Sequence, residues 1–353
     1  MTTSPSREQD RPHHYFERVD RSLPIVVESD PVCLYLETTN RCNILCGTCP
    51  RTFEDLEPPA DMSWTLFTSI VDQVPNIERV VLHGVGEPLM TRDLMSMIRY
   101  LKARGAYVLF NTNATLLTAK KAEELIEAEL DEMRVSLDAA EPVAYEQVRG
   151  LPLFNRVVEN VRAFVQLQRQ LGASTPRVSL WLTGLKETID QLPAFVRLAH
   201  VLGVEEVYLQ RLVYFNETQG LAREESALFE ALNSEQSRLI AEAERLAASL
   251  GVRFNASGAT EPGTSLHKQE TNRPWSLCRR PWTLMYFTAH GRALPCCIAP
   301  FSMKGYDSFT LGDATQQTLR EIWNGEKYRE FRRVLLTDRP AQPCENCGLR
   351  WSL

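Results

Sequence analysis

The cysteines are the residues of this 353-residue chain whose types and spacing could do chemistry, and they form two groups. Four of the nine lie in residues 33–49 and five in residues 278–347. Cys42, Cys46 and Cys49 form a C-x3-C-x2-C triplet. Structural zinc prefers four protein ligands, whereas a 4Fe–4S cluster held by three thiolates keeps one iron open to another ligand. The triplet therefore favours an iron–sulfur cluster with an open position over a zinc site.

A second set of four thiols lies near the C-terminus. Cys344 and Cys347 are spaced as C-x2-C, and Cys278 and Cys296 lie on either side of Gly291 as C-x12-G-x4-C. Four thiolates suit a structural zinc ion, and they also suit a coordinatively complete 4Fe–4S cluster that passes electrons. The residues alone leave both alternatives open.

Composition and charge narrow the class of protein. The chain is 44% hydrophobic and 24% charged, with a net charge of -6, which argues against a nucleic-acid surface. No apolar run approaches the roughly 20 residues of a membrane helix. The N-terminal stretch MTTSPSREQDRPHH lacks the apolar core of a secretory signal. We therefore expect a cytoplasmic protein with reduced cysteines that binds neither nucleic acid nor membrane.

A βα alternation positions the triplet. Short β-branched runs predict strands at 32–37, 79–84, 107–112, 132–137, 177–183 and 207–212. Segments of helical period lie between them, among them 63–74, 93–105, 119–130 and 187–203. Six such units predict an α/β fold, a partial (βα)6 TIM-like barrel, because eight are needed for closure. Chemistry in such folds gathers at the C-terminal strand ends, where the triplet follows the first strand.

The pattern changes after residue 255. We expect a loop at 257–275, a hairpin formed by 282–288 and 292–297, and one helix at 318–336. A bound metal would stabilise such a small α+β extension, since its own hydrophobic core is small. The expected division is a flexible or loosely docked arm at 1–30, the barrel at 31–255 and an iron–sulfur extension at 256–353.

The triplet, placed after the first strand of a βα barrel, resembles that of the radical S-adenosylmethionine (SAM) superfamily. The resemblance implies that the open iron chelates SAM and that the reduced cluster cleaves it to a 5′-deoxyadenosyl radical, which abstracts hydrogen from a substrate C–H bond. The C-terminal cysteines resemble the twitch extension, a shortened SPASM domain with one auxiliary cluster. The implied cofactors are SAM and two 4Fe–4S clusters, and the implied partner is an electron donor such as flavodoxin or ferredoxin.

Further motifs extend the resemblance. The HGVGEP segment is similar to the family's GGEP segment, which implies that Gly84, Gly86, Glu87 and Pro88 hold the SAM ammonium, although such a segment alone could be a simple turn. Ser136 and Arg149 match an SLD…RG pattern that implies contacts to the carboxylate and ribose side of SAM. Four strand-end residues complete the implied cofactor site: Asn111, Asn113, Leu209 and Gln210. Thr48 departs from the family, because many members carry an aromatic residue there.

Two cysteines remain outside the clusters. Cys33 is predicted to be a buried strand residue and Cys297 to have a packing role beside Cys296. By analogy with radical epimerases, either thiol could instead donate a hydrogen atom to a substrate radical, and Cys297 is the candidate catalytic residue.

The resemblance leaves the substrate open. We hypothesise oxidation (dehydrogenation) or epimerisation of a small molecule, such as a carbohydrate or aminocyclitol, as in other single-twitch enzymes. Arg211 is the candidate substrate contact, and other polar candidates are His83, Lys186, Glu187, Gln210 and Asn216. The alternative hypotheses are a maturase of a ribosomal peptide or protein, and a non-catalytic iron–sulfur or zinc scaffold.

Overall fold

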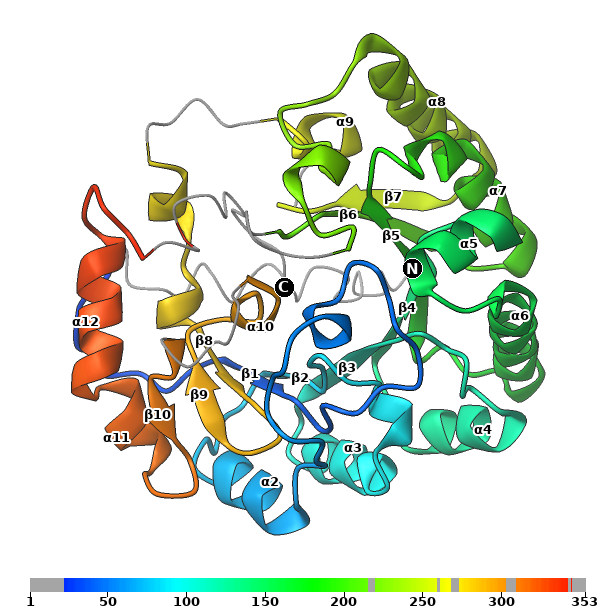
Figure 1. The fold of residues 1–353 in the computed structure, drawn as a ribbon. Coiled ribbons are helices and arrows are strands. Elements are labelled where there is room, and N and C mark those ends of the chain that lie inside the picture. The colour runs from blue at the N-terminus through cyan, green and yellow to red at the C-terminus, as the bar shows by residue number, and fades with distance from the viewer. Residues whose placement is uncertain are drawn as a thin grey trace, which may run out of the picture.

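The computed structural model describes residues 22–214, 220–258, 261–267, 273–302, 309–341 and 344. The described strands form one ten-stranded sheet in the order β10-β9-β8-β1-β2-β3-β4-β5-β6-β7. They are β1 Cys33–Leu36, β2 Arg79–Val81, β3 Tyr107–Thr112, β4 Glu132–Ser136, β5 Arg177–Gly184, β6 Glu206–Arg211, β7 Arg253–Ala256, β8 Leu284–Phe287, β9 Arg292–Leu294 and β10 Gly312–Asp313. Figure 1 shows this sheet as an open arc.

Strands β1 to β7 pair in parallel, each with the next along the chain. All four residues of β1 are buried, as expected of a parallel strand covered on both faces. The predicted α/β partial barrel and its six strands are confirmed. The seventh strand, β7, was not predicted, because its sequence RFNA is short and half of its residues are polar. It is an edge of the sheet, where exposed polar residues are tolerated.

The described helices lie mostly on the outer side of the arc, although the short helix α10 lies inside it (Figure 1). They are α2 Trp64–Val71, α3 Leu94–Lys102, α4 Ala119–Glu127, α5 Pro142–Arg149, α6 Phe154–Leu171, α7 Leu192–Leu202, α8 Ser234–Leu250, α9 Pro262–Ser265, α10 Ala299–Ser302, α11 Leu319–Trp323 and α12 Glu326–Leu335. Local sequence explains several of their ends. The Ser63 hydroxyl caps α2, Asn233 and Gln236 form a capping box on α8, and Gly203 ends α7 with φ of 72°. None of the described helices has the length and apolar character needed to cross a membrane.

The C-terminal extension continues the sheet of the barrel. Strand β8 pairs in parallel with β1, and β9 and β10 follow in antiparallel order. The predicted hairpin is thus present, and it brings the extension beside the first barrel strand. The single helix predicted at 318–336 is wrong, because α11 and α12 are separated at Asn324 and Gly325. A Cβ at Gly325 would lie 2.6 Å from the Glu321 carbonyl oxygen, which leaves no room for another residue type in this turn.

Residues 22–30 do not form a loose arm. Leu23 and Val27 are buried in the main core. The Asn324 side chain accepts a hydrogen bond from Val27 N at 2.9 Å and donates one to Val27 O at 2.8 Å. The Trp282 indole donates to Pro24 O at 2.8 Å. This part of the predicted arm is therefore docked on the C-terminal extension, while residues 1–21 lie outside the described residues.

Glu37 lies where the barrel meets the extension. Its carboxyl group accepts a hydrogen bond from Val85 N at 3.2 Å, in the loop after β2, and one from the Tyr286 hydroxyl of β8 at 3.4 Å. The side chain is 1% exposed, and burial raises the pKa of this carboxyl to about 8. Glu37 is therefore mostly protonated in the folded chain at neutral pH.

This raised pKa predicts a pH-dependent stability. An unfolded chain ionises Glu37 near pH 4.3, so the contribution of the protonated group is full below that pH and is lost as the pH rises through about 8. We expect the stability of the native protein to fall relative to Glu37→Gln between these values, by at most about 1.4 kcal/mol per pH unit. Anaerobic thermal unfolding at several pH values measures this difference.

Glu321→Gln is the matched control, because Glu321 is exposed and the Thr318 backbone N–H lowers its pKa. Its offset from the native protein should stay constant from about pH 5 to about pH 8. A constant offset for Glu37→Gln as well would contradict the raised pKa.

Candidate active site

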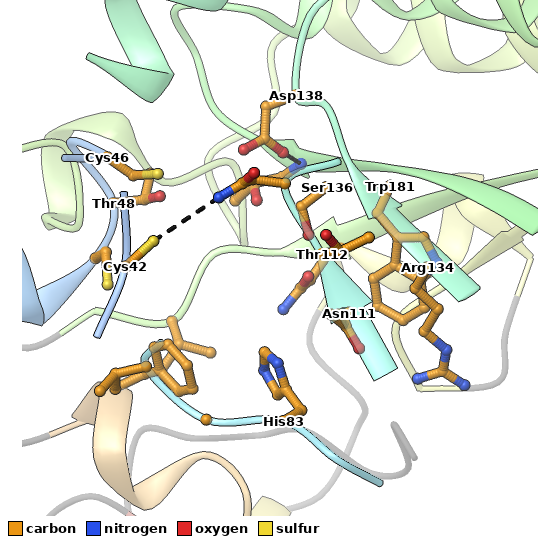
Figure 2. A pocket seen from close by; sticks show the side chains of 18 of the residues that line it. Cys42, Cys46, Thr48, His83, Asn111, Thr112, Arg134, Ser136, Asp138 and Trp181 are labelled. Carbon is orange, nitrogen blue, oxygen red and sulfur yellow. Dashed lines mark hydrogen bonds between the residues drawn. The ribbon is translucent and has the colours of Figure 1, made fainter. Parts of the chain in front are cut away.

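A cavity lies at the C-terminal ends of the parallel strands. Three parts of the chain enclose it. They are the loop 42–49 that carries the cysteine triplet (the cysteine loop), the ends of strands β2 to β6, and the segment 297–301 of the C-terminal extension. Figure 2 shows Cys42 and Cys46 on one side of this cavity, with Asn111 and Ser136 across from them. The space between the lining atoms is about 1280 Å³, with the open solvent at its mouth included.

All three cysteines of the triplet line this cavity. The loop that carries them is held by its own backbone, with Cys49 N donating to Cys46 O at 3.2 Å and the Thr52 hydroxyl donating to the same oxygen at 2.8 Å. Burial raises the pKa of Cys42, and it raises the pKa of Cys49 to about 12. Without a metal these thiols would be protonated, and a bound metal removes the proton outright.

The triplet fits a cluster better than a single ion. A tetrahedral zinc ion lies about 2.3 Å from each sulfur, which requires its thiolates to be within about 4 Å of one another. Structural zinc prefers four protein ligands, whereas three thiolates that line one cavity are the donor set of a 4Fe–4S cluster in which each thiolate binds a different iron and one iron stays open.

Most of the residues predicted to bind SAM come together here. Those that line the cavity are Gly84, Gly86, Glu87, Asn111, Asn113, Ser136, Arg149 and Gln210, together with Thr48. Pro88 and Leu209 are not among the lining residues. Pro88 begins a short 3₁₀ turn, and Leu209 is fully buried in the main core, because alternate residues of a strand face opposite sides. That each of these residues contacts SAM remains a prediction.

Glu87 ties the ends of two strands together. Its carboxylate accepts hydrogen bonds from the Thr112 hydroxyl at 2.6 Å, from Asn113 N at 2.8 Å and from Leu89 N at 3.1 Å. The group is 2% exposed, and burial raises its pKa. These bonds fix the loop after β2 against the end of β3, so Glu87 has a positioning role whatever it contacts in the cavity.

Two polar side chains reach the cysteine sulfurs. Asn113 Nδ2 lies 3.8 Å from Cys42 Sγ, the contact drawn as a dashed line in Figure 2. Arg149 Nη1 lies 3.5 Å from Cys46 Sγ, and Arg149 Nη2 forms an ion pair with Asp138 Oδ2 at 2.7 Å. Sequence reasoning assigned no role to Asp138, although it stands inside the same SLD segment as Ser136.

The far side of the cavity is aromatic and cationic. Arg134 donates to Glu132 at 2.6 Å, and its guanidinium lies 4.7 Å from the ring centre of Trp181. Figure 2 shows both side chains beyond Asn111, with His83 across from them. His83 is stacked 6.0 Å from Phe301, and burial lowers the His83 pKa to about 4, so the imidazole is neutral.

Arg134, Trp181 and Phe301 were missed by sequence reasoning. A signal existed for Arg134, because an arginine in the middle of a buried strand must face a polar interior or a partner. Of the polar candidates for substrate contact, His83, Gln210 and Arg211 line the cavity. Lys186 and Glu187 are not lining residues, and Glu187 instead accepts a hydrogen bond from the Ser226 hydroxyl at 2.6 Å. Asn216 lies outside the described residues.

The second cysteine set is described in part. Cys278, Cys296 and Cys344 are half-buried, and Cys347 lies outside the described residues. The four-ligand auxiliary site therefore remains a prediction. Cys297 is 7% exposed and lines the cavity, which keeps it a candidate hydrogen-atom donor. Cys33 is fully buried, as predicted, and burial raises its pKa to about 12.

An open parallel barrel, three cysteines at its strand ends and a cavity beside them define the class of radical SAM enzymes. A model of the Radical SAM superfamily matches residues 36–199. A model of the SPASM iron–sulfur cluster-binding domain matches residues 278–348. The chain belongs to the radical SAM superfamily and carries a C-terminal SPASM domain, so its cofactors are SAM and 4Fe–4S clusters.

Its relatives act on varied substrates. The chain is 26% identical over 330 residues to the tungsten-containing aldehyde ferredoxin oxidoreductase cofactor-modifying protein of Pyrococcus furiosus, covering 90% of this chain and 87% of that protein. It is 25% identical to the PqqA peptide cyclase of Gluconobacter oxydans, covering 92% and 84%. Among solved structures, Streptococcus suis SuiB bound to SAM aligns with a TM-score of 0.66 at 17% identity, covering 87% of this chain and 68% of SuiB. The SuiB likeness supports the fold.

Proposed function

We propose that this radical SAM enzyme modifies an amino-acid residue of a peptide or protein substrate. The observation that carries the proposal is the state of the carboxylates in the cavity. Among the described lining residues the carboxylates are Glu87 and Asp138, and both are already bound. Glu87 accepts three hydrogen bonds from the end of β3 and its own turn, and Asp138 is paired with Arg149.

This arrangement disfavours the aminocyclitol substrate hypothesised from the sequence. An aminocyclitol carries ammonium groups that need a carboxylate partner once they leave water. Beside polar side chains such as Gln210 and Arg211, the cavity offers the rings of Tyr35, Trp181 and Phe301. An amino-acid side chain, with an apolar body and at most one polar end, is better matched to such walls.

The relatives support the same substrate class. PqqA peptide cyclases of three genera, including Streptomyces rochei at 27% identity, align over more than nine-tenths of this chain. PqqA peptide cyclase acts, as its name states, on a peptide. Another relative, the AdoMet-dependent heme synthase of Methanosarcina barkeri, is 22% identical to this chain, as is the PqqA peptide cyclase of Xanthomonas campestris.

One side of the cavity would bind the cofactors, and the other side would bind the substrate. The bound cluster and SAM would supply a 5′-deoxyadenosyl radical that takes a hydrogen atom from the substrate. Cys42, Cys46 and Cys49 would hold the cluster, and the strand ends from Asn111 to Gln210 would hold SAM against it. The segment 297–301 would cover the substrate side and limit the access of water to the radical.

A deuterium-transfer experiment tests the substrate class. Cells of the source organism grown on deuterated medium are extracted, and the extract is divided by size into a polypeptide fraction and a small-metabolite fraction. Reconstituted enzyme, SAM and dithionite are added to each without oxygen. We expect mass spectrometry to find deuterium in 5′-deoxyadenosine with the polypeptide fraction, and treatment of that fraction with protease to remove the effect.

The Cys42→Ala, Cys46→Ala, Cys49→Ala triple variant is the control and should give no 5′-deoxyadenosine. If deuterium is instead transferred from the small-metabolite fraction, and protease treatment does not remove the effect, the carbohydrate hypothesis would be favoured over the peptide one. Absence of SAM cleavage by the fully reconstituted native protein would indicate the non-catalytic scaffold.

A further inference from the structure

The C-terminal end of α5 is docked on the cysteine loop. Val148 O accepts a hydrogen bond from Gly47 N at 2.8 Å, inside the triplet. Gly150 follows with φ of 76°, and a Cβ there would lie 2.3 Å from Leu45 O. Arg149 stands between these two contact points. Its position relative to Cys46 is therefore fixed by the backbone on both sides.

Both terminal nitrogens of the Arg149 guanidinium have a partner. Nη1 donates to Cys46 Sγ at 3.5 Å, while Nη2 pairs with Asp138 Oδ2 at 2.7 Å. The side chains of Arg149 and Asp138 are 9% and 3% exposed, so solvent screens this pair little. Asp138 is held in turn, because its Oδ1 accepts a hydrogen bond from Thr183 N at 2.7 Å.

We propose that Arg149 and Asp138 together set the reduction potential of the cluster that Cys46 would hold. A reduced cluster carries one more negative charge than an oxidised one. A cation that donates a hydrogen bond to a ligand sulfur stabilises the reduced state, and an anion close to it favours the oxidised state. Arg149 thus raises the potential, and Asp138 both orients Arg149 and offsets part of its charge.

This role differs from the SAM contact predicted for Arg149 from the sequence, and it does not depend on the substrate class. It makes Arg149 a positioning residue whose effect is measurable without turnover. It also predicts that loss of Arg149 and loss of Asp138 shift the reduction potential in opposite directions, which a purely structural ion pair would not do. Loss of either member of a structural pair would disturb the loop in the same way.

A redox titration of the reconstituted protein tests the proposal. The cluster is reduced stepwise with dithionite, and the electron paramagnetic resonance signal that changes on addition of SAM is followed. For Arg149→Gln we expect at least a tenfold shift of the equilibrium toward the oxidised cluster, which is a potential lower by about 59 mV for one electron. For Asp138→Asn we expect a shift of the opposite sign.

Arg41→Gln is the matched control. Arg41 precedes Cys42 in the chain, but its guanidinium pairs with Asp61 on the surface, where solvent screens its charge. Its potential should equal that of the native protein, with equal iron content. Shifts of the same sign in Arg149→Gln and Asp138→Asn, or no shift in either, would overturn the proposal. If Arg149→Gln fails to hold its cluster, Asp138→Asn decides alone, because an unchanged or lower potential in that variant would equally overturn the proposal.

Discussion

Changing Cys42, Cys46 and Cys49 together to Ala is expected to abolish SAM cleavage and to lower the iron content from about eight atoms per chain to about four. All three cysteines line one cavity, and the thiolate at each position would ligate one iron of the same cluster. The second cluster would be held by the C-terminal cysteines and should be retained. Iron is measured after anaerobic reconstitution, and 5′-deoxyadenosine is measured after addition of SAM and dithionite.

Cys33→Ala is the control for this experiment. Cys33 is fully buried in β1 and is not among the lining residues, so its loss should leave about eight iron atoms per chain. A native protein that holds about four iron atoms and one zinc ion would show that the C-terminal cysteines form a zinc site. Retention of all the iron by the triple variant would show that the triplet holds no cluster.

The sequence was most informative where the signal is local. The triplet spacing and the βα alternation depend on residues close in the chain, and the structure confirms the parallel sheet that positions the triplet. The docking of β8 on β1 could not be predicted, because nothing in either sequence specifies a pairing across about 250 intervening residues. The same holds for Val27 and Asn324, which join residues 22–30 to the C-terminal extension.

The candidate site was predictable on one side only. Residues near the cysteine loop belong to short motifs, such as HGVGEP, and most of them line the cavity. Arg134, Trp181 and Phe301 come from three separate elements and meet only in the folded chain. Whether a carboxylate is available also depends on the fold. Glu87 is occupied by Thr112 and Asn113 because β2 and β3 pair in one particular register, which brings those groups beside it.

Gly86→Ala is expected to have the second large effect. A Cβ at Gly86 would lie 2.1 Å from Thr39 O and 2.7 Å from Arg41 O, both backbone atoms of the segment that leads into Cys42. Arg41 O also accepts a hydrogen bond from Glu87 N at 2.8 Å, so the two segments cannot separate without losing it. The cysteine loop must therefore shift. We expect a loss of about 1–3 kcal/mol in stability and at least a tenfold weaker affinity for SAM, because the cavity changes shape around its open position.

Thermal unfolding and anaerobic equilibrium dialysis with SAM measure the two effects separately. Gly263→Ala is the matched control, since the nearest atom to a Cβ there is Glu244 Oε1 at 3.5 Å, an ordinary contact. It should not lower the stability, because Ala is favoured over Gly in a helix, and it should leave the SAM affinity unchanged. If Gly86→Ala keeps both the iron content and the SAM affinity of the native protein, then the close approach of Gly86 to Thr39 and Arg41 is not what positions Cys42. The position of the triplet would then depend chiefly on its contacts with α5, through Gly47 and Val148.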